Sequence, residues 1–292
     1  MSFRPTRSAL YMPGSNARAL EKAKGLNADA VILDLEDAVA PDQKGVARAQ
    51  VCAAVAAGGF GYRQVVIRIN ALDTPWGAED LAAAAAAKPD AVLLPKPNDA
   101  KDIERATDAM RRASAADSVA LWAMVETPLA ILNLRELAGA ARHAGSRLTC
   151  LVLGTNDLVK ETRIELDGPR TAALYWLSAS VTAARAFGLT VLDGVYNNFK
   201  DLAGLEQEAR QGRMLGFDGK TLIHPDQIAA ANQVFAPAGD EVVWARKIIA
   251  AFEQPDNKGK GVITLEGRMV ELLHAEMAQR TVAIADAIAA RG

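Results

Sequence analysis

Hydrophobic residues along this chain gather in eight short runs, separated by longer alanine- and leucine-rich segments. Most runs are continuous rather than alternating, which is typical of strands in a parallel sheet that helices cover. We predict strands at Ser8–Met12, Ala30–Leu35, Val65–Ile69, Ala91–Leu94, Ala120–Val125, Thr149–Leu153, Leu189–Leu192 and Lys220–Ile223. We predict helices at Ala17–Leu26, Lys44–Ala57, Ala78–Ala87, Ala100–Ala115, Leu129–Ala144, Arg170–Ala186 and Leu202–Leu215.

This alternation of strand and helix, repeated eight times, predicts an α/β protein of the (β/α)8 or TIM barrel type. The competing architecture is an open, doubly wound sheet. It is disfavoured because no glycine-rich phosphate motif follows the first strand.

The pattern changes after the eighth strand. Two further helices, a polar joint and a final amphipathic helix are predicted at Pro225–Val234, Ala238–Phe252, Glu253–Gly261 and Arg268–Ala290. The chain is therefore expected to divide into a barrel domain, residues 1–235, and a C-terminal helical extension, residues 236–292. A terminal helix usually docks on its own domain, but one behind a flexible joint can also act as a lid or reach a neighbouring subunit.

Composition narrows the class of protein. The 292 residues carry 33 Lys and Arg against 35 Asp and Glu, a balance that argues against nucleic acid as a partner. The two cysteines, Cys52 and Cys150, form no disulfide framework and are expected to be reduced thiols. No secretory signal and no run of about 18 apolar residues is evident, so we expect a cytoplasmic protein without membrane contact.

Polar residues follow most of the predicted strands. In a barrel of this type the active site lies at the C-terminal ends of the strands. Those ends carry, in order, Ser15 and Asn16, Asp34 to Asp37, Arg68 and Asn70, Lys96, Glu126, Asp157, Asp193 and His224.

Four carboxylates are expected to converge at this end: Glu36, Asp37, Glu126 and Asp157. Crowded like charges repel one another unless a cation lies among them. Mg²⁺ suits such a site because it binds one or two carboxylates and keeps positions for water and substrate oxygens. We assign Glu126 and Asp157 as direct ligands, with Glu36 and Asp37 holding metal-bound waters.

Several of these side chains also have a purely structural interpretation. Those interpretations are a turn or cap residue for Asp34, Asp37 or Asp193, a buried ion network for Arg68, a solvated loop charge for Lys96, and a rim position for His224. The sequence leaves both interpretations open.

Several ordered motifs together resemble the citrate lyase β-subunit-like family of the HpcH/HpaI aldolase superfamily, which includes malyl-CoA and citramalyl-CoA lyases and malyl-CoA thioesterases. The matching segments are Arg7–Gly14 (RSALYMPG), Ile32–Val39 (ILDLEDAV), Val66–Asn70 (VIRIN), Asp73–Pro75 (DTP), Leu94–Lys96 (LPK), Glu126–Pro128 (ETP), Gly154–Leu158 (GTNDL), Gly216–Lys220 (GFDGK) and Ile223–Pro225 (IHP). The resemblance runs from about Arg4 to the C-terminal helix.

The resemblance implies a TIM barrel, Mg²⁺ and a CoA thioester held at the barrel mouth. By position, Glu126 and Asp157 match the metal ligands of the family, and Arg68 matches its active-site arginine. Tyr11 and Lys22 fall where family members contact CoA, and we expect Lys96 to bind on the same side. The family also implies a homotrimer or hexamer in which the C-terminal segment of one subunit covers the site of the next.

One segment departs from the family pattern. Many members carry Asp-Gly-Lys-Met-Ile-Asp near the C-terminus, whereas this chain carries Glu266–Glu271 (EGRMVE). Glu271 stands where the family has the aspartate implicated in acting on the neighbouring site. Since glutamate is one methylene longer, we expect thioester hydrolysis to be slow in this chain.

The predicted activity is a Mg²⁺-dependent retro-aldol cleavage of a 3-hydroxy-3-carboxyacyl-CoA, of malyl-, citramalyl- or citryl-CoA type, into a 2-oxo acid and an acyl-CoA. Arg68 would stabilise the enolate, Glu36, Asp37 or a metal-bound water would transfer the proton, and Glu271 would act from a neighbouring subunit. The alternatives are a malyl-CoA thioesterase or malate-synthase-like activity, and a citrate lyase β subunit that acts on a carrier-bound ester.

Overall fold

The computed structural model describes residues 4–291, and these form two compact units. The larger unit is Thr6–Gln233, and the smaller one contains residues 234–291 together with Arg4 and Pro5. Each unit has its own core.

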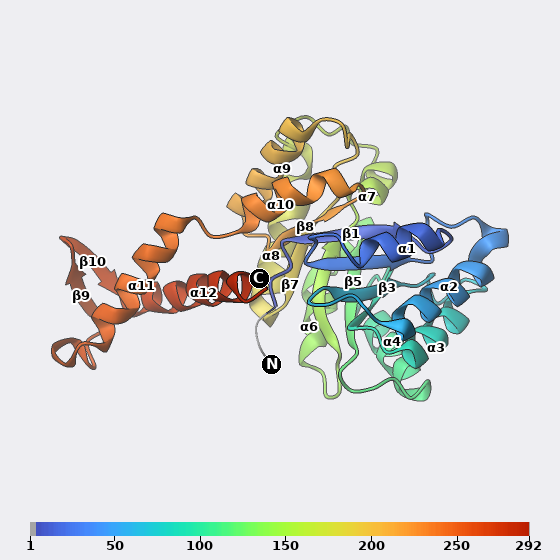
Figure 1. Ribbon diagram of the computed structural model, residues 1–292, viewed down its shortest axis with the longest axis horizontal. Helices are drawn as coiled ribbons and strands as arrows, with labels where there is room; N and C mark the ends of the chain where they lie inside the picture. The colour runs from blue at the N-terminus through green and yellow to red at the C-terminus, as the bar shows by residue number, and fades with distance from the viewer. Residues whose placement is uncertain (1–3, 292) are drawn as a thin grey trace. The chain divides into compact units, whose positions relative to one another are not determined.

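The larger unit is a closed barrel of eight parallel strands in sequential order, as predicted (Figure 1). The strands are β1 (Ser8–Pro13), β2 (Ala30–Asp34), β3 (Gln64–Arg68), β4 (Ala91–Leu94), β5 (Ala120–Val125), β6 (Leu148–Leu153), β7 (Thr190–Asp193) and β8 (Gly219–Leu222). Pairing of β8 with β1, for example Lys220 opposite Ser8, closes the ring. The continuous hydrophobic runs are explained because consecutive residues of these strands are buried on both sides of the sheet.

Side chains that alternate along the strands fill the barrel interior. This core includes Ile32, Leu93, Trp122, Met124 and Val152. Small residues complete it at Ala9, Ala30, Ala91 and Cys150, so the large Trp122 side chain fits inside. The barrel interior is thus a packed core, and we expect the functional residues at the C-terminal ends of the strands.

Helices connect the strands of the barrel, and a further helix follows β8. They are α1 (Ala17–Ala23), α2 (Lys44–Ala57), α3 (Gly77–Ala87), α4 (Ala100–Arg112), α5 (Pro128–Leu132), α6 (Leu134–Gly139), α7 (Thr155–Thr162), α8 (Leu174–Phe187), α9 (Leu202–Leu215) and α10 (Ile228–Phe235).

Two predicted details of this region were wrong. The single helix expected at Leu129–Ala144 is divided into α5 and α6, because Asn133 leaves helical geometry and its side-chain amide donates to the carbonyl of Asn98. No helix was predicted between the sixth strand and Arg170, but the structure has the short helix α7 there, at Thr155–Thr162.

The smaller unit consists of α11 (Gly239–Glu253), a hairpin of β9 (Val262–Leu265) and β10 (Arg268–Glu271), and α12 (Leu272–Ala289). Ile248, Ile263 and Val270 lie in its core. The prediction that Arg268–Glu271 belongs to the last helix was wrong. Glu266 and Gly267 both have positive φ angles, 48° and 76°, which is typical of a two-residue hairpin turn.

Among the described residues, every helix is too short or too polar to span a lipid bilayer.

Candidate functional site

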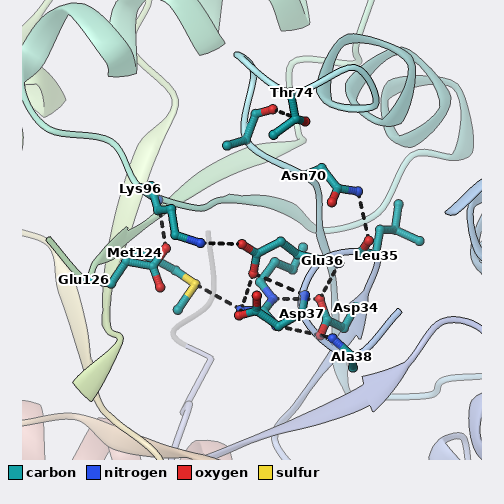
Figure 2. A network of polar contacts seen from close by, with 12 residues as sticks. Asp34, Leu35, Glu36, Asp37, Ala38, Asn70, Thr74, Lys96, Met124 and Glu126 are labelled. Carbon is teal, nitrogen blue, oxygen red and sulfur yellow. Dashed lines mark hydrogen bonds and ion pairs between the residues drawn. The ribbon is translucent and has the colours of Figure 1, made fainter. Parts of the chain in front are cut away.

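Arg68, at the end of β3, is held by three carboxylates. Figure 2 labels these three, Asp34, Glu36 and Asp37. Its Nε and Nη2 donate to the two oxygens of Asp34 at 2.7 and 2.6 Å. Its Nη1 lies 2.8 Å from Glu36 Oε2 and 3.4 Å from Asp37 Oδ2. Arg68, Asp34 and Glu36 are buried, whereas Asp37 is exposed. The buried ion network that the sequence left open for Arg68 is therefore present.

Asp34 has a second role as a cap. Its Oδ1 accepts the backbone N–H of Glu36 at 2.9 Å, and its Oδ2 accepts that of Ala38 at 3.3 Å. The same carboxylate thus fixes both the guanidinium of Arg68 and the turn that carries Glu36. Since a planar fork binds a carboxylate in one orientation, Arg68 has little freedom to move.

Tyr11 lies next to Arg68, with its ring centroid 4.9 Å from the guanidinium carbon. Its hydroxyl is 3.9 Å from Met124 Sδ, and Met124 also lies 3.7 Å from Arg68 Nη1. Burial raises the pKa of Tyr11 well above its usual range, although Arg68 opposes the shift. Tyr11 therefore stays a neutral phenol beside the ion network, and its predicted contact with CoA remains a prediction.

Lys96 links β4 to this network. It lies between two prolines with a left-handed φ of 54°, and its Nζ donates to Glu36 Oε1 at 2.7 Å. Burial alone would lower the pKa of Lys96, but the carboxylates of Glu36, Glu126 and Asp37, with Glu36 first, together outweigh burial and raise it. Lys96 is therefore not a solvated loop charge. Its backbone N–H donates to Glu126 Oε1 at 2.8 Å, so it contacts two of the predicted carboxylates.

Glu126, directly after β5, is fully buried. Within the described part of the chain, its Oε2 has no hydrogen-bond partner. Burial, together with the negative charges of Glu36 and Asp157, raises the pKa of Glu126 to about 8, and Lys96 and Arg68 oppose the shift. A buried carboxylate oxygen without a partner is costly, so this atom is suited to bind a cation.

Gly154, at the start of α7, leaves room for that oxygen. A Cβ at this position would lie 2.6 Å from Glu126 Oε2 and 2.5 Å from Glu126 Cβ. No larger residue fits here while Glu126 keeps its present position.

Asp157 lies in the first turn of α7 and is half-buried. Two contacts fix the start of this helix. Thr155 packs against Gly194, and Asn156 and Asn197 exchange amide hydrogen bonds of 2.8 and 3.2 Å. The negative charge of Asp157 contributes to the raised pKa of Glu126, as expected of two carboxylates that share a site.

The four predicted carboxylates do not form one ligand cluster. Arg68 and Lys96 hold Glu36, and Asp37 lies exposed beside Arg68. In residues 4–291, no group of three or more His, Cys, Asp or Glu side chains is arranged to hold a metal ion. Mg²⁺ requires only one or two carboxylates besides water and substrate oxygens, so Glu126 and Asp157 fit that ion.

The other predicted site residues belong to other elements. Lys22 is exposed in the last turn of α1. Glu271 belongs to the smaller unit, where it precedes α12 and its backbone N–H donates to His274 Nδ1 at 3.0 Å. His224 stacks on Phe199, with ring centroids 4.8 Å apart, which agrees with a structural role at the rim.

Asp193 is not a simple turn residue. It is fully buried, accepts from Arg170 Nη1 at 2.8 Å, and lies 3.0 Å from Lys220 Nζ. Sequence reasoning missed Arg170 because it precedes Asp193 by 23 residues in the sequence and lies in a loop. It also missed Lys44, which reads as an ordinary first residue of α2 but is buried, with its ammonium directed at backbone carbonyls near Glu36.

Known proteins resemble this chain over nearly its whole length. A (3S)-malyl-CoA thioesterase of Cereibacter sphaeroides is 48% identical over 288 residues, 99% of this chain and 97% of that protein. The citrate lyase subunit beta of Escherichia coli is 37% identical over 92% of this chain and 89% of its own. The structure of CitE from Mycobacterium tuberculosis in complex with magnesium, acetoacetate and coenzyme A covers 95% of this chain and 98% of its own, at 30% identity and a TM-score of 0.73.

The family model described as HpcH/HpaI aldolase/citrate lyase matches residues 7–225, which include every predicted barrel site residue. The family suggested by the sequence motifs is thus confirmed. This chain belongs to the HpcH/HpaI aldolase/citrate lyase family.

Proposed function

We propose that this protein is a Mg²⁺-dependent enzyme that acts on a 3-hydroxyacyl-CoA whose hydroxyl-bearing carbon also carries a carboxylate, with (3S)-malyl-CoA as the first candidate. The observation that carries the proposal is the buried, unpartnered Oε2 of Glu126 in the neighbourhood of Asp157. The magnesium, acetoacetate and coenzyme A in the CitE structure, and the name of the Cereibacter relative, support the same metal and substrate class.

Glu126 and Asp157 are the proposed metal ligands. When bound, Mg²⁺ polarises the hydroxyl and carboxylate oxygens of the substrate and fixes their orientation. Proton transfer and stabilisation of the oxyanion are assigned to Glu36 and the side chains around it.

Glu36 is the proposed proton-transfer group. Burial raises the pKa of Glu36, although Arg68 and Lys96 oppose the shift. The pKa of Asp37 moves the other way: burial would raise it, but Glu36 and Arg68 outweigh burial and lower it. Two adjacent carboxyl groups whose pKa values are pushed apart commonly divide proton transfer and charge stabilisation between them. Arg68, fixed by Asp34, supplies the positive charge for the oxyanion that develops on the thioester.

Two reactions fit this arrangement. In hydrolysis, water adds to the thioester carbonyl, the C–S bond breaks, and malate and CoA leave. In cleavage, the hydroxyl loses its proton, the C–C bond breaks, and glyoxylate and the enolate of acetyl-CoA form, which then takes up a proton.

We rank hydrolysis first because the relative that is 48% identical over 99% of this chain is a malyl-CoA thioesterase. This reverses the order that the Glu271 substitution suggested from the sequence. Cleavage, the retro-aldol reaction predicted above, remains the second candidate, favoured by the citrate lyase relative.

The C-terminal extension, residues 236–292, is proposed to cover the site of a neighbouring subunit in a homotrimer or hexamer. Large apolar side chains close to Glu271 in sequence are exposed in the smaller unit: Met269, Leu272, Leu273 and Met277. Several exposed apolar side chains on a small unit favour a contact with another surface. Mixing a Glu126→Gln variant with a Glu271→Ala variant tests this proposal, since malate formation from malyl-CoA recovers only if Glu271 of one subunit completes the site of another.

The deciding experiment uses (3S)-malyl-CoA and Mg²⁺ and measures free malate, glyoxylate, CoA and acetyl-CoA separately. Malate and CoA in equal amounts support hydrolysis, and glyoxylate with acetyl-CoA supports cleavage. Citramalyl-CoA and citryl-CoA are assayed separately as alternative substrates. Turnover of a carrier-bound ester but of no free CoA ester would overturn the proposal in favour of a citrate lyase β subunit.

A further inference from the structure

Lys44 is a buried lysine outside the barrel that the proposed chemistry does not use. It begins α2 and is only 6% exposed. Its ammonium lies 5.4 Å from the ring centroid of Trp76. A lysine is costly to bury unless its donors are satisfied, so the hydrogen-bond partners of the Lys44 ammonium indicate its role.

Those contacts are two consecutive backbone carbonyls. Lys44 Nζ donates to the carbonyl oxygen of Leu35 at 2.9 Å and to that of Glu36 at 2.7 Å. Both residues belong to the turn that follows β2, the same turn that directs the Glu36 side chain toward Arg68 and Lys96.

A second buried group holds the same turn. Asn70 Nδ2 donates to the carbonyl oxygen of Leu35 at 2.8 Å (Figure 2) and to Asp80 Oδ2 at 2.6 Å. Asp80 is fully buried and pairs with Arg48 at 2.6 Å. Asn70 anchors Leu35 alone, whereas Lys44 is the side chain that reaches the carbonyl of Glu36 itself.

We infer that Lys44 is a positioning residue, which fixes the backbone of Leu35 and Glu36 and thereby aims the Glu36 carboxylate between Arg68 and Lys96. The inference rests on the proposed function for the role of Glu36. Lysine is suited to this task because one ammonium with three rotatable donors reaches two adjacent carbonyls, which a rigid guanidinium fork matches less well.

The test is a double-mutant cycle between Lys44→Met and Glu36→Gln. A misplacement of about 1 Å at a reacting group can cost on the order of 10²-fold in rate. We therefore expect Lys44→Met to lower kcat by about 10-fold to 10²-fold in the wild-type background with little change in KM. In the Glu36→Gln background the same change should lower kcat by less than about twofold, because residues that act as one unit are not additive. Equal losses in both backgrounds would overturn the inference.

Asn232→Leu is the matched control. Asn232 is also a buried side chain that donates to a loop carbonyl, that of Asn27 at 2.6 Å, but it does so before β2, at the opposite end of the barrel. It should lower the urea midpoint without changing kcat. If Lys44→Met does not fold, Lys44→Arg replaces it, with a smaller expected loss of kcat in the same cycle.

A structural measurement separates this inference from the proposed function. In a crystal structure of Lys44→Met, the Glu36 carboxylate should leave its 2.7 Å contact with Lys96 Nζ. An unchanged contact would overturn the inference whatever reaction the enzyme performs. Failure of the wild type to convert malyl-CoA, citramalyl-CoA and citryl-CoA would overturn the proposed function and leave the structural measurement to decide on Lys44.

Discussion

Two buried arginines of the barrel allow a sharp test of Arg68. Arg68 binds Asp34 through Nε and Nη2 at the end of the barrel that carries the candidate site. Arg7 binds Asp29 in the same forked way, with both contacts at 2.8 Å, just before β1 and β2 at the opposite end. The two arginine side chains are 8% and 10% exposed, and both aspartates are buried. The two forked pairs therefore match in geometry and differ in their position relative to the site, although Arg68 also pairs with Glu36 and Asp37.

The perturbation is arginine to lysine at each position. Lysine keeps the charge but cannot bind both carboxylate oxygens through a planar fork. Breaking a buried ion pair completely costs about 3–5 kcal/mol, and a retained charge recovers part of it, so each variant should lose about 2–4 kcal/mol of unfolding free energy. Arg68→Lys should also lower kcat by about 10²-fold, the scale for losing one oxyanion donor.

The assay combines urea unfolding with steady-state turnover of malyl-CoA at saturating Mg²⁺. We expect similar losses of stability in the two variants, an unchanged kcat in Arg7→Lys and a reduced kcat in Arg68→Lys. Equal kcat values in both variants would refute the assignment of Arg68 to the reaction. An Arg68→Lys variant with a raised KM and an unchanged kcat would assign it to uniform substrate binding instead.

Three further predictions concern the metal, the tail and acid stability. Glu126→Gln keeps the size of the side chain but removes its charge, so calorimetry should record at least about a tenfold weaker affinity for Mg²⁺, and chelators should abolish wild-type turnover; full activity in chelator would exclude the metal site. Glu271→Asp should raise the malate-to-glyoxylate ratio from malyl-CoA if the tail carboxylate acts on the thioester, and Glu271→Ala should lower it. Burial would raise the pKa of Asp193, but Lys220 and Arg170 outweigh burial and lower it below its ordinary value of 3.8. The stabilisation from this carboxylate is therefore present above that value and is lost as pH falls through the lower folded pKa, so urea midpoints between pH 5 and 2 should fall more steeply for wild type than for Asp193→Asn.

The fold was predictable because one physical pattern repeats eight times. Strand boundaries predicted from continuous apolar runs lie within one residue of those in the structure, as at Ala91–Leu94 and Ala120–Val125. Boundaries set by single polar contacts were not predictable. The break at Asn133 depends on a carbonyl 35 residues away, at Asn98, and the hairpin turn at Glu266 places a non-glycine residue at positive φ.

The position of the candidate site was predictable from the sequence, but which of its side chains pair with one another was not. The rule that polar residues at strand ends meet found Glu36, Arg68, Lys96 and Glu126, which the structure brings together. It did not indicate that Asp34 would hold Arg68, since the choice among three neighbouring acids depends on side-chain directions. Lys44 was missed for another reason: its contacts are with backbone carbonyls, which leave no signature in the residue pattern.

Gly154 shows how a residue without functional groups can limit which sequences this enzyme tolerates. The space that Glu126 Oε2 occupies exists because residue 154 has no Cβ. Even alanine, which adds a single methyl group, would have to displace Glu126 or the start of α7. A random-mutagenesis screen for activity should accordingly find position 154 nearly as intolerant of substitution as Glu126 itself. Evolutionary change at the proposed metal site is then constrained by the missing side chain at position 154 as well as by charge.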